Sequence, residues 1–85
     1  MKYLDCVEVI VEKECYAKYG VHKGMQGVIW MEECIDGKWD VYFSQYGNKE
    51  DIAEIPVMEE DLKLLPAGMD ARVNERIKAQ FEKRI

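Results

Sequence analysis

Three cysteines and a single histidine are the residues of this chain best suited to covalent or metal chemistry. His22 is a candidate general base for a cysteine nucleophile at Cys6, Cys15 or Cys34. Such a site needs the base within hydrogen-bond reach of the thiol and a third group that orients the base, and the spacing indicates neither. Cys6 and Cys34 fall in strand patterns, so we predict small core residues there, and we predict a surface loop position for His22.

The same four residues are of the types that bind zinc. Structural zinc sites draw their ligands from short pairs such as C-x2–4-C, whereas the gaps here are eight, six and eleven residues. We therefore expect no metal and no cofactor. An odd number of cysteines without a CxxC pair also argues against a disulfide framework.

Adjacent acids occur at positions 32–33, 50–51 and 59–61. Hydrolysis by two carboxylates requires a pair that faces each other across a cleft, and neighbours on a strand point to opposite faces. No catalytic residue is predicted, and we expect the protein not to be an enzyme. The acids are predicted to form either a solvated face or a docking surface for a basic partner.

Gly20, Gly24 and Gly27 surround the histidine in the segment GVHKGMQG. A phosphate cradle needs glycines between a strand and a following helix, whereas these glycines precede a strand pattern and no GK[ST] follows. Glycine in this position commonly supplies a positive φ or a close backbone approach. We predict a structural turn into the second strand.

Length and charge limit the class of protein. Eighty-five residues make one domain with one core, and no apolar run approaches the roughly 18 residues that span a bilayer. Acids also interrupt the apolar start of the chain, so we expect a cytoplasmic protein without a membrane partner.

The net charge is −5, and all three arginines lie in residues 67–85. An acidic body favours a basic protein partner and repels nucleic acid, which only the basic tail could bind.

Alternating apolar residues predict four or five short strands. The Asp36-Gly37 pair is a hairpin signal, and Pro56 either shortens its strand or places it at an edge. We expect a mainly β fold, a small antiparallel barrel of about five strands over residues 1–66. The expected strands are 6–12, 27–34, 38–45, 51–57 and, after one helical turn, a short last strand near 62–65.

The apolar period changes to four residues from Gly68 onward. This predicts an amphipathic C-terminal helix within residues 67–85, part of the same domain, with Asp70 as its N-cap. An isolated helix of this length is only marginally stable in water. Its apolar stripe must therefore dock on the barrel or on another chain, as in a homodimer. The stripe consists of Val73, Ile77, Phe81 and Ile85.

The order of these pieces resembles that of SH3-like barrels. Gly-x-x-x-Gly-x-x-Gly and a hydrophobic residue precede an acidic strand, then DGKWDVYF, then MEEDLKLL. This succession is similar to a family of short bacterial SH3-like domains of unknown function, distantly similar to the nitrile hydratase β-subunit barrel and to KOW-type modules. The resemblance covers about residues 5–65 and implies a fold but no catalytic residues. Val28 and Tyr42 depart from the small polar residue and the acid that are usual in this family.

The aromatic residues give the sharpest prediction of a site. If Trp39 and its alternating neighbours Val41 and Phe43 point into the barrel, Tyr42 points outward with Trp30 beside it. An exposed Trp–Tyr pair among acids is typical of a protein-binding hot spot, unless the C-terminal helix covers this face. The predicted partner contacts are Trp30, Tyr42, Glu32, Asp40, Glu50 and Asp51.

Taken together, these features predict a non-enzymatic protein-binding module. Small acidic proteins of this kind often serve as immunity proteins, and by this analogy of charge and size we expect one that neutralises a basic nuclease toxin by steric occlusion assisted by charge pairing. The alternatives are an accessory or assembly subunit of a larger enzyme, by analogy with the nitrile hydratase-related barrels, or a self-associating barrel. In both alternatives the stripe of the C-terminal helix is the interface.

Overall fold

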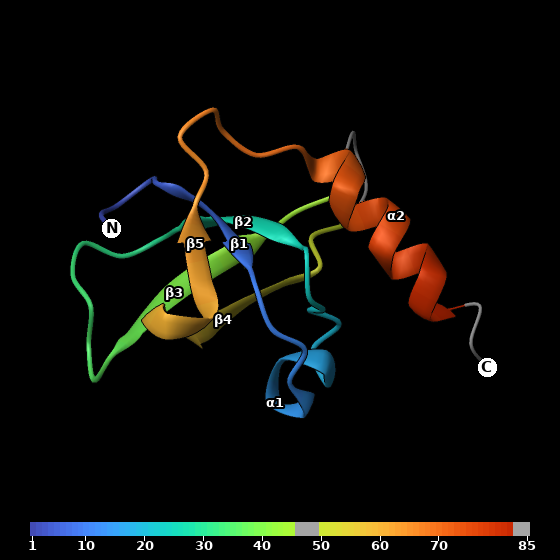
Figure 1. Ribbon diagram of the computed structural model, residues 1–85, viewed down its shortest axis with the longest axis horizontal. Coiled ribbons are helices and arrows are strands. Elements are labelled where there is room, and N and C mark those ends of the chain that lie inside the picture. The colour runs from blue at the N-terminus through green and yellow to red at the C-terminus, as the bar shows by residue number, and fades with distance from the viewer. Residues whose placement is uncertain (46–49, 83–85) are drawn as a thin grey trace.

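The computed structural model describes residues 1–45 and 50–82. Within them, five antiparallel strands form one curled half-barrel sheet, and a C-terminal helix packs at one end of it (Figure 1). The predicted mainly β fold is confirmed. The strands, paired in the order β4-β3-β2-β1-β5, are β1 Cys6–Val9, β2 Gln26–Ile29, β3 Lys38–Phe43, β4 Ala53–Met58 and β5 Leu62–Leu64.

Three helical segments complete the described chain: α1 at Glu14–Ala17, a 3-10 turn η1 at Glu59–Asp61 and α2 at Ala71–Glu82. The turn before β5 was predicted, whereas α1 falls in a stretch predicted only as a connection. The start of α2 confirms the predicted cap, because Asp70 Oδ1 accepts a hydrogen bond from the backbone N–H of Arg72 at 2.9 Å.

The hairpin between β2 and β3 ends in the predicted two-residue turn. Asp36 and Gly37 have φ values of 52° and 75°, and the flanking Ile35 and Lys38 exchange two backbone hydrogen bonds of 3.0 and 2.9 Å. Positive φ at both central residues is the geometry of a type I′ turn, which matches the twist of the strands. Pro56 lies opposite Asp40 in β4, an edge strand as predicted.

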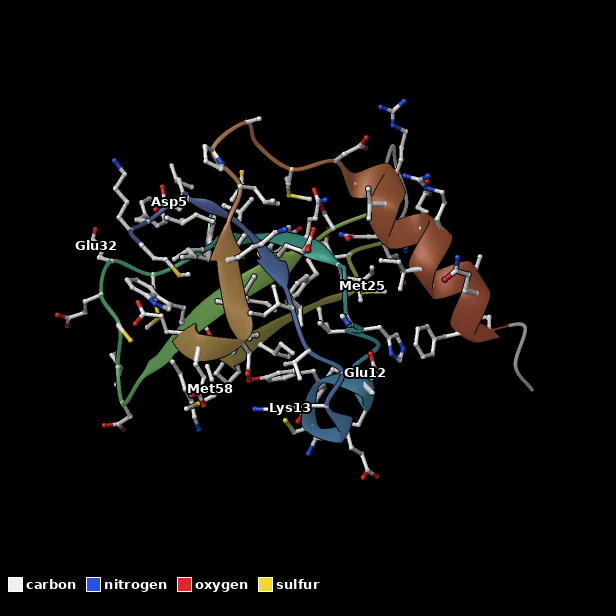
Figure 2. All side chains as sticks on the ribbon, in the orientation of Figure 1. Asp5, Glu12, Lys13, Met25, Glu32 and Met58 are labelled. Carbon is white, nitrogen blue, oxygen red and sulfur yellow. The ribbon has the colours of Figure 1, made fainter. Side chains whose placement is uncertain are left out.

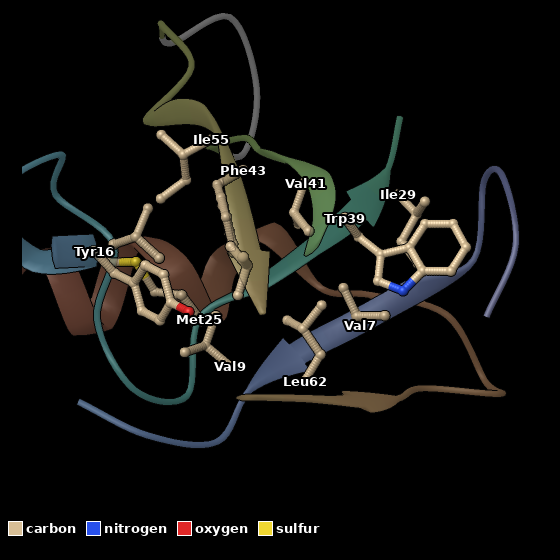
Figure 3. Close-up of a cluster of buried hydrophobic side chains, with 12 residues drawn as sticks. Val7, Val9, Tyr16, Met25, Ile29, Trp39, Val41, Phe43, Ile55 and Leu62 are labelled. Carbon is tan, nitrogen blue, oxygen red and sulfur yellow. The ribbon is translucent and has the colours of Figure 1, made fainter. Parts of the chain in front are cut away.

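The core lies on the concave side of the sheet and follows from the alternation of apolar residues. Trp39 and Tyr16 lie toward opposite ends of this cluster, each 4% exposed (Figure 3). Burial of each large apolar side chain contributes about 1.5–3 kcal/mol. The buried cluster comprises Val7, Val9, Tyr16, Val21, Met25, Ile29, Trp39, Val41, Phe43, Ile55, Val57 and Leu62.

The glycines before and within β2 serve the structural role predicted for them. Gly24 has a φ of 91°, a conformation that favours glycine. At Gly27 a Cβ atom would lie 2.7 Å from the backbone oxygen of Tyr42. The absence of a side chain at Gly27 therefore lets β2 and β3 approach each other closely.

Helix α2 docks on its own chain. The Phe81 ring stacks on the His22 ring with centroids 3.5 Å apart, and the nearest atom to the Cβ position of Gly24 is the Ile77 Cδ1. Val73, Ile77 and Phe81 are all partly buried. The predicted stripe position Ile85 lies outside the described residues.

Two predicted positions are wrong. His22 is not a surface residue: its side chain is 13% exposed, and its Nδ1 lies 2.8 Å from Glu12 Oε2. It is covered because α2 places Phe81 over the ring. Cys34 is exposed rather than in the core, because β2 ends at Ile29 and leaves Cys34 in the connection to β3.

Candidate functional site

The outer face of the sheet brings together three aromatic rings, Tyr3, Trp30 and Tyr42, which we call the aromatic face. The centroid of the Trp30 ring lies 6.1 Å from that of Tyr42 and 5.6 Å from that of Tyr3. The side-by-side arrangement of Trp30 and Tyr42 confirms the geometry expected from the alternation in β2 and β3. The prediction did not include Tyr3.

Strand pairing fixes the positions of these rings. Val28 pairs with Tyr42 in the β2–β3 ladder, and the N–H of Trp30 donates to the carbonyl of Asp40 at 2.9 Å, which continues the ladder beyond β2. The N-terminal segment runs alongside, because the N–H of Leu4 donates to the carbonyl of Ile29 at 2.9 Å. This last pairing brings Tyr3 beside Trp30. The only signal in the sequence was an aromatic residue shortly before the first strand.

The aromatic face is open to solvent. Trp30 is 51% exposed and Tyr3 is 41% exposed, whereas Tyr42 is partly buried. The connection that begins at Trp30 lies at the opposite end of the molecule from α2 (Figure 1). The helix therefore does not cover Trp30, and the face presents apolar area of the kind that marks interaction sites.

Three carboxylates are tied to these rings by strand pairing or hydrogen bonding. Asp40 lies opposite Trp30, and Glu54 lies opposite Tyr42 in the β3–β4 ladder. A hydrogen bond to the Asp51 carboxylate raises the pKa of the Tyr42 hydroxyl, and the nearby charges of Asp51 and Glu54 act in the same direction. Glu54 was missed by the prediction, although its place in the alternation of β4 was readable.

The other two predicted acids are less directly connected to the face. Glu32 is exposed and lies at the opposite end of the molecule from α2 (Figure 2). Glu50 is also exposed, and its backbone carbonyl accepts a hydrogen bond from Gln45 Nε2 at 2.7 Å. Both carboxylates add negative charge to the surface, but no strand pairing places them against the rings.

A hollow of about 310 Å³ adjoins Asp40 on this side of the sheet. Its walls combine apolar groups with two carboxylates, which suits a long cationic side chain with an apolar stem. A lysine at its rim opposes that charge in part. The lining residues are Met31, Ile35, Asp36, Lys38, Asp40 and Pro56.

Among the described residues, no group of three or more acidic, cysteine or histidine side chains is arranged to hold a metal ion. No helix in residues 1–45 and 50–82 has the length and apolar character needed to cross a membrane.

Comparisons of the chain with protein-family models, with curated proteins and with solved structures found no match. The resemblance to small bacterial SH3-like domains therefore stays a prediction from the sequence. The five-stranded half-barrel is observed in the structure and does not depend on that resemblance.

Proposed function

We propose that this protein is a non-enzymatic binding module that holds a protein with a basic surface through the aromatic face. The observation that supports this most directly is the half-exposed indole of Trp30 between the rings of Tyr3 and Tyr42. Exposed tryptophan and tyrosine side chains supply large contact areas with few rotatable bonds, and they are enriched among the residues that dominate interface energies.

The negative charge of the chain and of the aromatic face favours a partner with a basic surface. The carboxylates of Asp40, Asp51 and Glu54 lie around the rings, and the chain carries a net charge of −5. Carboxylates at the rim of an interface mainly accelerate encounter with a positively charged partner. The hollow beside Asp40 would take an arginine or lysine side chain of that partner.

A narrower form of this proposal is an immunity protein that blocks a basic toxin by occluding its site. It is supported by size and acidity alone. The alternative of an accessory subunit or a homodimer seated on the α2 stripe has less support, because Val73, Ile77 and Phe81 are already partly buried against the chain's own barrel.

The test compares variants of the aromatic face with a matched control. Proteins captured by the wild type from a cell lysate are identified, purified and titrated against Trp30→Ala and Asp40→Asn/Asp51→Asn by calorimetry. Tyr19→Ala is the control, because Tyr19 is an aromatic residue 53% exposed and outside the face.

We expect Trp30→Ala to weaken binding by about 2 kcal/mol or more, as for a hot-spot residue. The double acid variant is expected to weaken binding mainly at low salt, where the charges are least screened, and Tyr19→Ala is expected to bind normally. Equal affinity of the wild type and Trp30→Ala for the partner would refute the proposed face.

A further inference from the structure

We propose that a second site, a lysine-lined pocket between α1 and the edge strand β4, binds a small organic anion with a flat apolar body. The pocket has a volume of about 480 Å³, within the range of small-molecule sites. None of the three rings of the aromatic face lines it, but its lining shares Lys38 and Pro56 with the hollow beside Asp40 and includes Glu54. Its polar and aromatic lining includes Lys13, Lys18, Lys38, Tyr16, Tyr19 and Cys15.

Tyr16 lines the pocket and is held in place by its buried hydroxyl. This hydroxyl donates to Asp61 Oδ2 at 2.6 Å and accepts a hydrogen bond from the backbone N–H of Met58 at 3.1 Å. Lys13 Nζ donates to the same carboxylate oxygen at 2.7 Å. These contacts attach α1 to the end of β4, and Lys13 and Met58 lie on the α1 side of the molecule (Figure 2). The pocket is therefore formed before any ligand binds, which lowers the entropic cost of binding.

Charge in the pocket is opposite to that of the whole chain. Asp61 matches the charge of Lys13. The other charged residues that line the pocket are Lys18, Lys38 and Glu54, and Lys38 also lines the hollow beside Asp40. The Lys18 Nζ also lies 5.2 Å from the centroid of the Tyr19 ring. Two exposed lysines, one of them beside an aromatic ring, would attract an anion that carries a planar group.

The strand edge next to the pocket is poorly suited to bind a peptide as a further strand. Pro56 has no N–H to donate, and the N–H of Met58 is already bonded to Tyr16. Strand addition depends on such main-chain donors. The apolar side chains of Ile55, Pro56 and Met58 remain available as a wall for the flat part of a small ligand.

Cys15 provides a direct readout because it is exposed and lines the pocket, and Cys34 is an exposed reference outside it. Alkylation of both thiols by N-ethylmaleimide is followed by mass spectrometry with phenyl phosphate, inorganic phosphate or benzyl alcohol present. We expect saturating phenyl phosphate to slow the reaction of Cys15 by about fivefold or more, with Cys34 unaffected, because a ligand bound in a pocket covers side chains that line it. Inorganic phosphate should protect only at higher concentration, and benzyl alcohol should not protect.

Charge-matched variants complete the test. Lys18→Gln/Lys38→Gln should raise the Kd for phenyl phosphate, measured by NMR titration, by about tenfold, since it removes two charge-assisted hydrogen bonds. Lys2→Gln/Lys23→Gln makes the same change in net charge outside the pocket lining and should leave the Kd unchanged. An unprotected Cys15, equal slowing of both thiols, equal protection by benzyl alcohol, or the same Kd in both double variants would overturn the proposal.

Discussion

The side chain of Asn74 in α2 pairs with the backbone of Gln26 in β2 as a neighbouring strand would. Its Oδ1 accepts from the N–H of Gln26 at 2.7 Å, and its Nδ2 donates to the carbonyls of Gln26 at 2.7 Å and Ser44 at 2.9 Å. The β2–β3 register pairs Val28 with Tyr42, so Gln26 would next face Ser44. The amide therefore fills the place where the two strands separate, and it attaches α2 to the sheet.

Replacement of Asn74 should be more damaging than its small size suggests. Asn74 is fully buried, so Asn74→Ala leaves three partly buried backbone groups of Gln26 and Ser44 without this partner. We expect a loss of about 2–3 kcal/mol in the free energy of unfolding, measured by urea denaturation. Gln80→Ala, at an exposed position of the same helix, should change stability by less than about 0.5 kcal/mol. If Asn74→Ala changes the free energy of unfolding as little as Gln80→Ala does, this amide does not stabilise the attachment of α2 to the sheet.

Truncation of the two tryptophans should lower stability by very different amounts. Trp39 is 4% exposed and donates from its indole N–H to Glu59 Oε1 at 3.1 Å, so Trp39→Ala should cost about 3–5 kcal/mol. Trp30→Ala should cost less than about 1 kcal/mol, because the Trp30 side chain is already half exposed. Thermal and urea unfolding of both variants provide the comparison, and similar losses would contradict the assignment of inner and outer faces.

A methyl group at Gly27 should disrupt the contact between β2 and β3. The added Cβ would lie 2.7 Å from the backbone oxygen of Tyr42 and from Val41 Cγ1, so Gly27→Ala should cost about 2 kcal/mol or more. Gly68→Ala is the matched control, because no atom lies within 4 Å of its Cβ position and only its φ of 93° is unfavourable. That strain costs about 1 kcal/mol. Differential scanning calorimetry should therefore rank Gly27→Ala below Gly68→Ala in stability.

The sequence was most informative where structure depends on neighbouring residues. The turn at Asp36-Gly37, the alternation around Trp39 and the cap at Asp70 each depend on a few adjacent positions, and each was predicted. The features that were missed depend on distant pairings. Tyr16 is buried against Asp61, which lies 45 residues away, and that contact attaches α1 beside the end of β4, where the pocket lies.

The same limit explains the errors around the candidate site. His22 reads as a surface loop residue until Phe81, far along the chain, is placed over its ring. Tyr3 joins the aromatic face only because the backbone of Leu4 pairs with Ile29. Periodicity identifies which side of a strand a residue faces, but it does not identify which other segment lies next to it.

High pH should weaken the attachment of α1 through Tyr16. Burial, together with the hydrogen bond to Asp61, raises the pKa of Tyr16 to about 12, whereas an unfolded tyrosine titrates near pH 10. The stabilisation is complete below about pH 10 and is lost as the pH rises toward about 12, because the unfolded chain releases the proton first. Urea unfolding of the wild type and Tyr16→Phe should therefore show a stability difference that shrinks over that interval. A constant difference would mean that the hydroxyl is not shielded.

Low pH should act on the same cluster through Asp61. Burial opposes ionisation of this carboxylate, but the hydrogen bonds from Lys13 and Tyr16 outweigh it and lower the pKa of Asp61. An unfolded aspartate titrates near about pH 3.9, so the stabilisation is complete above that pH and is lost as the pH falls through the lower folded-state value.

Asp61→Asn isolates this effect, since asparagine can still accept from Tyr16 but carries no charge for Lys13. The variant should be less stable than the wild type at neutral pH, and the difference should diminish as the pH falls below about 4, because the unfolded chain takes up the proton there while the folded carboxylate stays ionised to a lower pH. Glu33→Gln, at an exposed position of the β2–β3 connection, removes one negative charge without touching the cluster and should leave stability nearly unchanged. If acid unfolding follows the same curve in all three proteins, Asp61 does not link α1 to the end of β4 through its charge.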